Sequence, residues 1–229
     1  MKEFLRIVGL VTLLLASSHM YSQVCTPDTV SFPNSGIYPL TLEPACIGQI
    51  YEQVITVNVP VDTMLSGFPL AIPINWVRLD SIVGLPAGFT VSCEPDTCQI
   101  AGGSSGCIVI SGIPTATDTF ILDLAVTVEG NFGGPLVVSD TLRDYYTLIV
   151  APAPSIALVS SSDASCPGAE DGSISVMSSG GIGDHEYSID NGLTWQADTV
   201  FDGLSSGPYE VLVSDSSGCT GILSVVINA

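Results

Sequence analysis

Acid–base or nucleophilic chemistry in this chain would have to run through one histidine, because only His185 remains once the amino-terminal leader described below is removed. Asp184 adjoins His185 and serines are abundant, so the residue types of a Ser-His-Asp hydrolase are present. No Gly-x-Ser-x-Gly elbow occurs in a strand-turn-helix context, however. A single histidine in an acidic loop is typical of a solvated polar residue. We therefore predict no catalytic residue.

Pairs of carboxylates could cleave glycosidic bonds or hold a hard cation. Each available pair lies in a predicted turn, where acidic side chains are common because turns face water. Calcium is the stronger alternative, but no Asp-x-Asp-x-Asp-Gly loop occurs. We predict no metal and no cofactor, with calcium left open. The pairs are Glu170 with Asp171, Asp184 with Glu186, and Asp198 with Asp202.

Seven cysteines, all beyond the leader, indicate an oxidising compartment in which disulfides persist. Their spacing matches no common zinc motif, and no histidine lies near the central three. We expect Cys25 to pair with Cys46 across the amino-terminal segment. Since seven is odd, either one thiol stays free or the pairing crosses these groups. We expect Cys98 to pair with Cys107 around a glycine-rich turn, which leaves Cys93 in doubt.

Two tryptophans are the large aromatic residues to place. Trp195 follows the Asn191-Gly192 turn, and its ring could bind the face of a sugar. The simpler interpretation is that it caps the core, because large aromatic side chains usually dominate burial. Trp76 stands in a strand pattern, and we expect it in the core. Trp195 is therefore a weak candidate for ligand binding.

Residues 1–22 have the pattern of a signal peptide. Lys2 and Arg6 precede an apolar run, Leu5 to Ala16, and small serines follow it. Acylation of Cys25 would require small residues before it, which Gln23-Val24 does not supply. We expect a protein that is secreted to the extracellular space or the cell surface and is not an integral membrane protein after cleavage.

The mature chain is strongly acidic. The whole sequence has 4 basic and 23 acidic residues; the leader takes Lys2, Arg6 and Glu3, which leaves 2 basic and 22 acidic residues and a net charge of −20. Such a surface repels phosphate backbones, so nucleic acid is excluded as a partner. The 46% hydrophobic content predicts packed cores and argues against disorder.

The elements that position these side chains are predicted to be strands throughout, because short alternating apolar segments recur and no helical period competes with them. Such a rhythm predicts an all-β fold of antiparallel sandwiches. Ala151-Pro152-Ala153-Pro154-Ser155 is expected to be an extended linker that holds two domains, 24–150 and 156–229, apart. Before the linker we expect strands at 49–59, 75–85, 89–93, 107–110, 119–128 and 136–150.

The segment from Cys166 to Cys219 reads as a small sandwich of its own. Asp171-Gly172 and Asn191-Gly192 suit tight turns between its strands. Cys166 precedes its first strand and Cys219 precedes its last, Gly221 to Asn228, after which we expect no anchor or sorting domain. We expect a Cys166–Cys219 disulfide, which would stabilise the segment by about 4 kcal/mol through loop closure.

This segment, about residues 156–229, resembles the SprB repeat. The cysteine frame, Gly180-Gly181 before an aromatic strand, Gly203-Leu204, Gly207-Pro208-Tyr209, and the ending Asp215-Ser216-Ser217-Gly218-Cys219 carry the resemblance. The family implies a module of bacterial surface adhesins, some of them associated with gliding motility. The resemblance therefore implies attachment to surfaces and no chemistry.

A second resemblance covers about residues 49–130. Gly84-Leu85-Pro86-Ala87-Gly88-Phe89, followed by Ile110-Ser111-Gly112-Ile113-Pro114-Thr115 and a long strand, is similar to immunoglobulin-like or cadherin-like modules of bacterial surface proteins. That family implies a spacer or binding role.

Together these observations predict a non-enzymatic bacterial adhesion or binding module, with extracellular polysaccharide or a surface protein as partner. One alternative is a passive spacer in an extracellular assembly. The other is an accessory, carbohydrate-binding part of a secreted hydrolase.

Overall fold

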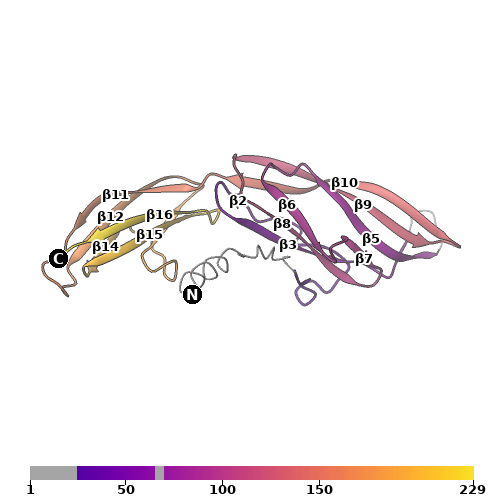
Figure 1. Ribbon diagram of the computed structural model, residues 1–229, viewed down its shortest axis with the longest axis horizontal. Helices are drawn as coiled ribbons and strands as arrows, with labels where there is room; N and C mark the ends of the chain where they lie inside the picture. Colours follow the sequence, from indigo (N-terminus) through magenta and orange to yellow (C-terminus); the bar gives the residue numbers. More distant parts are fainter. Residues whose placement is uncertain (1–24, 65–69) are drawn as a thin grey trace, which may run out of the picture.

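The structure is a computed structural model that describes residues 25–64 and 70–229 (Figure 1). The predicted signal peptide lies outside these residues. Every regular element among them is a β-strand, sixteen in all, and no helix occurs in the described part of the chain. The strands form two sandwiches placed end to end, so the all-β prediction is confirmed.

The amino-terminal sandwich has the strand order of an immunoglobulin domain, in which strands A, B, E and D form one sheet and G, F and C the other. Its first sheet has the order β1 (Gly36–Tyr38), β3 (Tyr51–Asn58), β8 (Ser105–Gly112) and β6 (Phe89–Glu94). Its second has the order β2 (Ala45–Cys46), β10 (Pro135–Ala151), β9 (Asp118–Asn131), β5 (Ala71–Val83) and β4 (Asp62–Met64), and β7 (Gln99–Ala101) also pairs with β5. All pairings are antiparallel except that of β2 with β10.

Alternation along the strands fills the core between these sheets. Ile108 and Ile110 of β8 face Leu122 and Leu124 of β9, and all four side chains are buried. Cys107 and Val109 alternate with the isoleucines and so face the opposite side of the sheet, where Cys25 covers them. The chain before β1 therefore lies on the outer face of this sheet.

The carboxy-terminal sandwich is smaller and has its own core. One sheet has the order β11 (Pro154–Ser162), β12 (Gly172–Gly180) and β14 (Val200–Leu204), and the other β13 (His185–Ser188), β15 (Gly207–Asp215) and β16 (Thr220–Ile227). Strand β12 contributes Ile174 and Val176 to the core, and β15 contributes Val211 and Val213.

The junction between the sandwiches is short and packed. Only Pro152 and Ala153 separate β10 from β11, and both Ala151 and Pro154 are buried. Thr220 receives a 2.6 Å hydrogen bond on its carbonyl from the Gln49 side chain. A disulfide, Cys46–Cys219, joins the two sandwiches directly. The connection is therefore shorter than the linker predicted at 151–155, since Ala151 belongs to β10 and Pro154 to β11, and the two sandwiches are also bonded directly at this junction.

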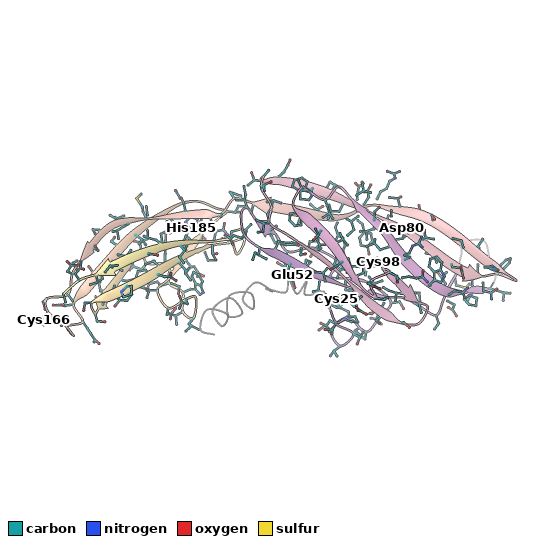
Figure 2. All side chains as sticks on the ribbon, in the orientation of Figure 1. Cys25, Glu52, Asp80, Cys98, Cys166 and His185 are labelled. Atoms are coloured by element: carbon teal, nitrogen blue, oxygen red, sulfur yellow. A yellow bond between two sulfur atoms is a disulfide. The ribbon has the colours of Figure 1, made fainter. Side chains whose placement is uncertain are left out.

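The predicted Cys166–Cys219 disulfide is wrong. Strand β11 leads away from the junction to the loop that holds Cys166, whereas β16 begins at the junction just after Cys219. A nine-residue strand spans roughly 30 Å, far beyond the Cα separation of a disulfide. Cys166 is instead a free, exposed thiol at the far tip of the molecule (Figure 2).

The other two predicted pairings are also replaced. Cys25 pairs with Cys107, which lies beneath it on the outer face of the sheet, and this also removes the sulfur that acylation would need. Cys98 pairs with Cys93 across the turn after β6. Cys93 packs toward the main core, whereas Cys107 faces the opposite side of the sheet, where it bonds to Cys25. Cys98 therefore forms its disulfide with Cys93 and not with Cys107. The three disulfides fit an extracellular location.

The predicted strands at 49–59, 89–93, 119–128 and 136–150 correspond closely to β3, β6, β9 and β10. Trp76 is placed wrongly by the sequence, since it does not join the core. It alternates with Val77 on β5 and lies half-buried on the outer face, where the guanidinium of Arg78 covers its ring at 5.6 Å.

Candidate functional site

The loop after β13 presents Trp195 on a fixed scaffold of hydrogen bonds. Asp190 is at its centre: its Oδ1 accepts from the Thr194 N–H at 2.9 Å and its Oδ2 from the Thr194 hydroxyl at 2.6 Å. The Ser188 hydroxyl also donates to Asp190 at 2.8 Å. At the loop's end Gln196 and Tyr187 exchange both backbone hydrogen bonds. The loop is therefore ordered without help from a ligand.

Trp195 is on the surface and is not part of the core cluster, so the ring does not cap the core as the simpler interpretation expected. It packs on Gly192, where a Cβ would lie 3.2 Å from the indole, and the φ of +81° there also favours glycine. The side chain is 37% exposed and that of Leu193, beside it, 84%. Together they form an aromatic and apolar contact surface.

The hydrogen bonds lower the pKa of Asp190 to about 2, with those from the Thr194 hydroxyl and N–H as the leading causes. The carboxylate form favours the ordered loop, so this contribution is present above the ordinary value of 3.8 and is lost as pH falls toward 2. We expect Trp195 fluorescence, measured in a Trp76→Phe background, to stay constant from pH 7 to about 4 and to change between about 4 and 2. An Asp190→Ala control should show the altered signal at every pH. A transition centred at or above pH 4 would contradict this assignment.

His185 lies near the junction and is held by a chain of hydrogen bonds (Figure 2). Its Nε2 is 3.0 Å from the Gly180 carbonyl, which can only accept, so Nε2 carries the proton. Nδ1 then accepts from the Ser178 hydroxyl at 2.5 Å, and Ser178 in turn accepts from the Tyr187 hydroxyl at 2.5 Å. The structure thus brings a serine to the histidine, which motif searching missed because the two residues lie on facing sheets.

This network has the composition of a serine–histidine pair but a different arrangement. A backbone carbonyl, and not a carboxylate, accepts the ring N–H of His185. Tyr187 is buried and lies on β13 with His185, and the Ser178 hydroxyl reaches both side chains from β12 of the facing sheet. The network therefore joins β12 to β13.

Of the predicted carboxylate pairs, Glu170 and Asp171 both lie in the loop before β12, but the other two pairs lie only partly outside strands, because Glu186 belongs to β13 and Asp202 to β14. Asp171 accepts from the Ser165 N–H and Asp198 from the Val200 N–H, and the hydrogen bond from Ser165 lowers the pKa of Asp171. Asp184 and Glu186 flank His185 along the chain. Within 25–64 and 70–229, no three His, Cys, Asp or Glu side chains form a group that could hold a metal ion. The calcium alternative stays untested.

Asp215, which the sequence analysis named only as part of the SprB-like ending, organises the junction side of the carboxy-terminal sandwich. The side chain is 6% exposed and accepts from the Ser217 N–H and hydroxyl, the Cys219 N–H and the Ile182 N–H, at 2.7 to 3.0 Å. Burial alone raises its pKa, but these hydrogen bonds outweigh burial and lower it. Gly181 has to be glycine because a Cβ would lie 2.7 Å from the Asp215 carboxylate.

Two hollows in the amino-terminal sandwich were also missed by sequence reasoning. One, of about 580 Å³, lies between the first residues and the outer face of β3 and has Asp28, Phe32 and Gln53 in its lining. The other, of about 330 Å³, is mainly apolar and lies where the second sheet extends beyond the first, lined by residues such as Ile74 and Val128.

The described strands and turns after β10 cover the region in which a family model matches. Residues 158–194 match the SprB repeat. The matched SprB repeat region begins within β11, includes β12, β13 and Gly181, and ends at Thr194, which holds Asp190. The SprB resemblance of the sequence is thus confirmed over these residues, and it indicates a surface adhesion-type module.

Several solved structures are similar at low identity. A 282-residue carboxy-terminal fragment of intimin, in complex with an intimin-binding domain, is 13% identical with a TM-score of 0.36; the match covers 85% of this chain and 64% of the fragment. The class 5 fimbriae chaperone CfaA is 12% identical with a TM-score of 0.31, over 86% of this chain and all of the chaperone. The Yersinia pseudotuberculosis adhesin InvE is 14% identical with a TM-score of 0.20, over 84% and 58%.

No curated protein matches the chain. In the described ranges no helix is long and apolar enough to cross a membrane.

Proposed function

We propose that this protein is a non-enzymatic adhesion module that acts outside the cell, where it contacts a polysaccharide or a surface protein. The match of residues 158–194 to the SprB repeat carries this proposal. Three disulfides support the extracellular setting. We propose further that the sandwiches correspond to two domains, 24–150 and 156–229, with the signal peptide removed.

The Trp195 loop, residues 188–200, is the contact surface that we propose. Its hydrogen bonds are formed before any partner arrives, so binding would spend little free energy on ordering the loop. An exposed indole beside Leu193 can pack on the apolar face of a sugar or on a protein side chain. The acidic remainder of the surface disfavours anionic partners.

A binding screen of the oxidised chain against polysaccharides and whole cell surfaces, with calcium and with chelator, tests the proposal. We expect saturable binding that weakens at least about tenfold, or about 1.4 kcal/mol, in Trp195→Ala, because a rigid indole that is held in place before binding is the kind of side chain that dominates contact energies. Leu193→Ala should weaken it less. Ile222→Ala is the matched control, since Ile222 is 59% exposed on β16 of the same sandwich and lies outside the loop.

The alternatives give other outcomes. A passive spacer would show no saturable binding while melting cooperatively, and that result would overturn the adhesion proposal. An accessory part of a hydrolase would bind polysaccharide only, and any turnover lost in His185→Ala would make the Ser178–His185 pair catalytic. Loss of binding in chelator would add a calcium site.

A further inference from the structure

The Cys46–Cys219 disulfide closes a covalent loop around most of the molecule. The two cysteines are 173 residues apart in the sequence, and most of both sandwich cores lies between them. A chain that carries load from one end to the other transmits it along the shortest covalent path. Residues inside a closed loop are bypassed by that path and cannot be extended.

The shortest path from Cys25 to Ala229 is brief. It runs 21 residues from Cys25 to Cys46, crosses the disulfide, and runs 10 residues from Cys219 to Ala229. These 31 residues span at most roughly 110 Å when fully extended. The Cys25–Cys107 and Cys93–Cys98 disulfides offer no shorter route. Most of both cores is thus outside the loaded path.

We propose that Cys46–Cys219 is a tension clasp, which prevents residues 47–218 of the two sandwiches from being extended when the protein is pulled from its two ends. The inference rests on the proposed adhesive function, because an adhesion module is loaded between its anchor and the surface it holds. If the load enters at Trp195 and the anchor is amino-terminal, the path runs 21 residues from Cys25 to Cys46 and 24 residues from Cys219 back to Trp195, so most of the amino-terminal core is still bypassed. The clasp itself requires no ligand.

The packing around the clasp suits this role. Strand β2, which holds Cys46, pairs with the end of β10 through Ala45 and Val150, and the Ile47 N–H donates to Ala151 at 3.0 Å. On the other side, β16 leads from Cys219 away from the junction and pairs with β15 at eight positions. Tension along β16 therefore acts on all eight pairs together, and not on one at a time.

Single-molecule force spectroscopy tests the clasp. The oxidised chain is pulled from its ends, and any residues before Cys25 add the same length to every variant. We expect the extension beyond Cys25 to stop near the 31-residue limit. In Cys46→Ser/Cys219→Ser the path runs through Cys25–Cys107 and then 122 residues, or at most roughly 440 Å. With all disulfides reduced, 204 residues extend to at most roughly 730 Å.

Cys25→Ser/Cys107→Ser is the matched control, because it removes a buried disulfide without changing the shortest path, and its limit should equal that of the unaltered chain. If the unaltered oxidised chain extends to the 122-residue limit or beyond, or if the control extends further than it, the clasp is overturned. Should the Cys46→Ser/Cys219→Ser variant fail to fold, the limit of the unaltered chain before and after reduction decides the question. If the chain binds no surface but its extension stops at the 31-residue limit, the adhesion proposal is refuted and the tension-clasp proposal still holds.

Discussion

Replacing both junction cysteines, in Cys46→Ser/Cys219→Ser, is expected to lower the free energy of unfolding by about 5 kcal/mol. The disulfide closes a loop of 173 residues, and the loop-closure entropy that it removes from the unfolded chain is of this size. We also expect one thermal transition to become two, because each sandwich then unfolds around its own core. Calorimetry of the oxidised proteins measures both effects.

Cys93→Ser/Cys98→Ser is the control for this experiment. It opens a loop of only 5 residues in sequence separation, so the same reasoning gives a loss of about 2 kcal/mol and no splitting of the transition. An equal or larger loss in this control would contradict the importance of the junction disulfide.

Asp215→Ala should cause the second large effect, a loss of about 3 kcal/mol. The substitution leaves the N–H groups of Ile182, Ser217 and Cys219 without their acceptor; the Cys219 donor is buried and the other two are part-buried, and unsatisfied donors of this kind are costly. Denaturant unfolding measures the loss. Because Cys219 lies in this turn, we also expect slower formation of the junction disulfide on refolding.

Two comparisons make the Asp215 prediction specific. Asp215→Asn keeps one acceptor oxygen for Ser217 and Cys219 but places a donor against the Ile182 N–H, so it should lose less than the alanine variant. Since the pKa of Asp215 is lowered, its contribution is present above the ordinary value of 3.8 and disappears as pH falls further. The alanine variant should therefore be less sensitive to acid below about pH 4. Equal stability of all three proteins at pH 7 would refute this role.

Strand positions could be predicted because they depend on local alternation. The runs at 119–128 and 136–150 have strong β patterns, and β9 and β10 form there. Trp76 shows the limit of such reasoning. The strand that contains Trp76 was predicted. Which face of that strand meets the core depends on how the partner sheet packs, and this is not visible in local sequence. Trp76 lies on the outer face, where the guanidinium of Arg78 covers its ring.

Cysteine pairing could not be predicted because it depends on which ends of strands meet. Cys166 and Cys219 bracket one sandwich in sequence yet lie at its opposite ends, since Cys166 follows β11 at the far tip and Cys219 lies between β15 and β16 at the junction. Cys46 is remote in sequence from Cys219 but lies beside Ala151, where β10 passes into the second sandwich. The signal for that pairing is tertiary and not local.

The candidate contact loop was partly predictable. Asn191-Gly192 marked the turn, and Trp195 was named as a weak candidate for ligand binding, although the simpler interpretation placed its ring over the core and the structure exposes it. The structural roles of Asp190 and Asp215 could not be predicted from the sequence, because acidic residues are common in turns. Only the N–H and hydroxyl groups that donate hydrogen bonds to these two carboxylates distinguish them from other acidic residues. The same holds for Ser178, whose partner His185 comes from the facing sheet.

Disulfide mapping tests the account's main claim most directly. The oxidised chain is alkylated without reduction, digested, and analysed by mass spectrometry. The structure predicts a peptide pair that links Cys46 to Cys219 and an alkylated Cys166. A Cys166–Cys219 pair, which the sequence alone suggested, would leave the two sandwiches without a covalent clasp and would contradict the account.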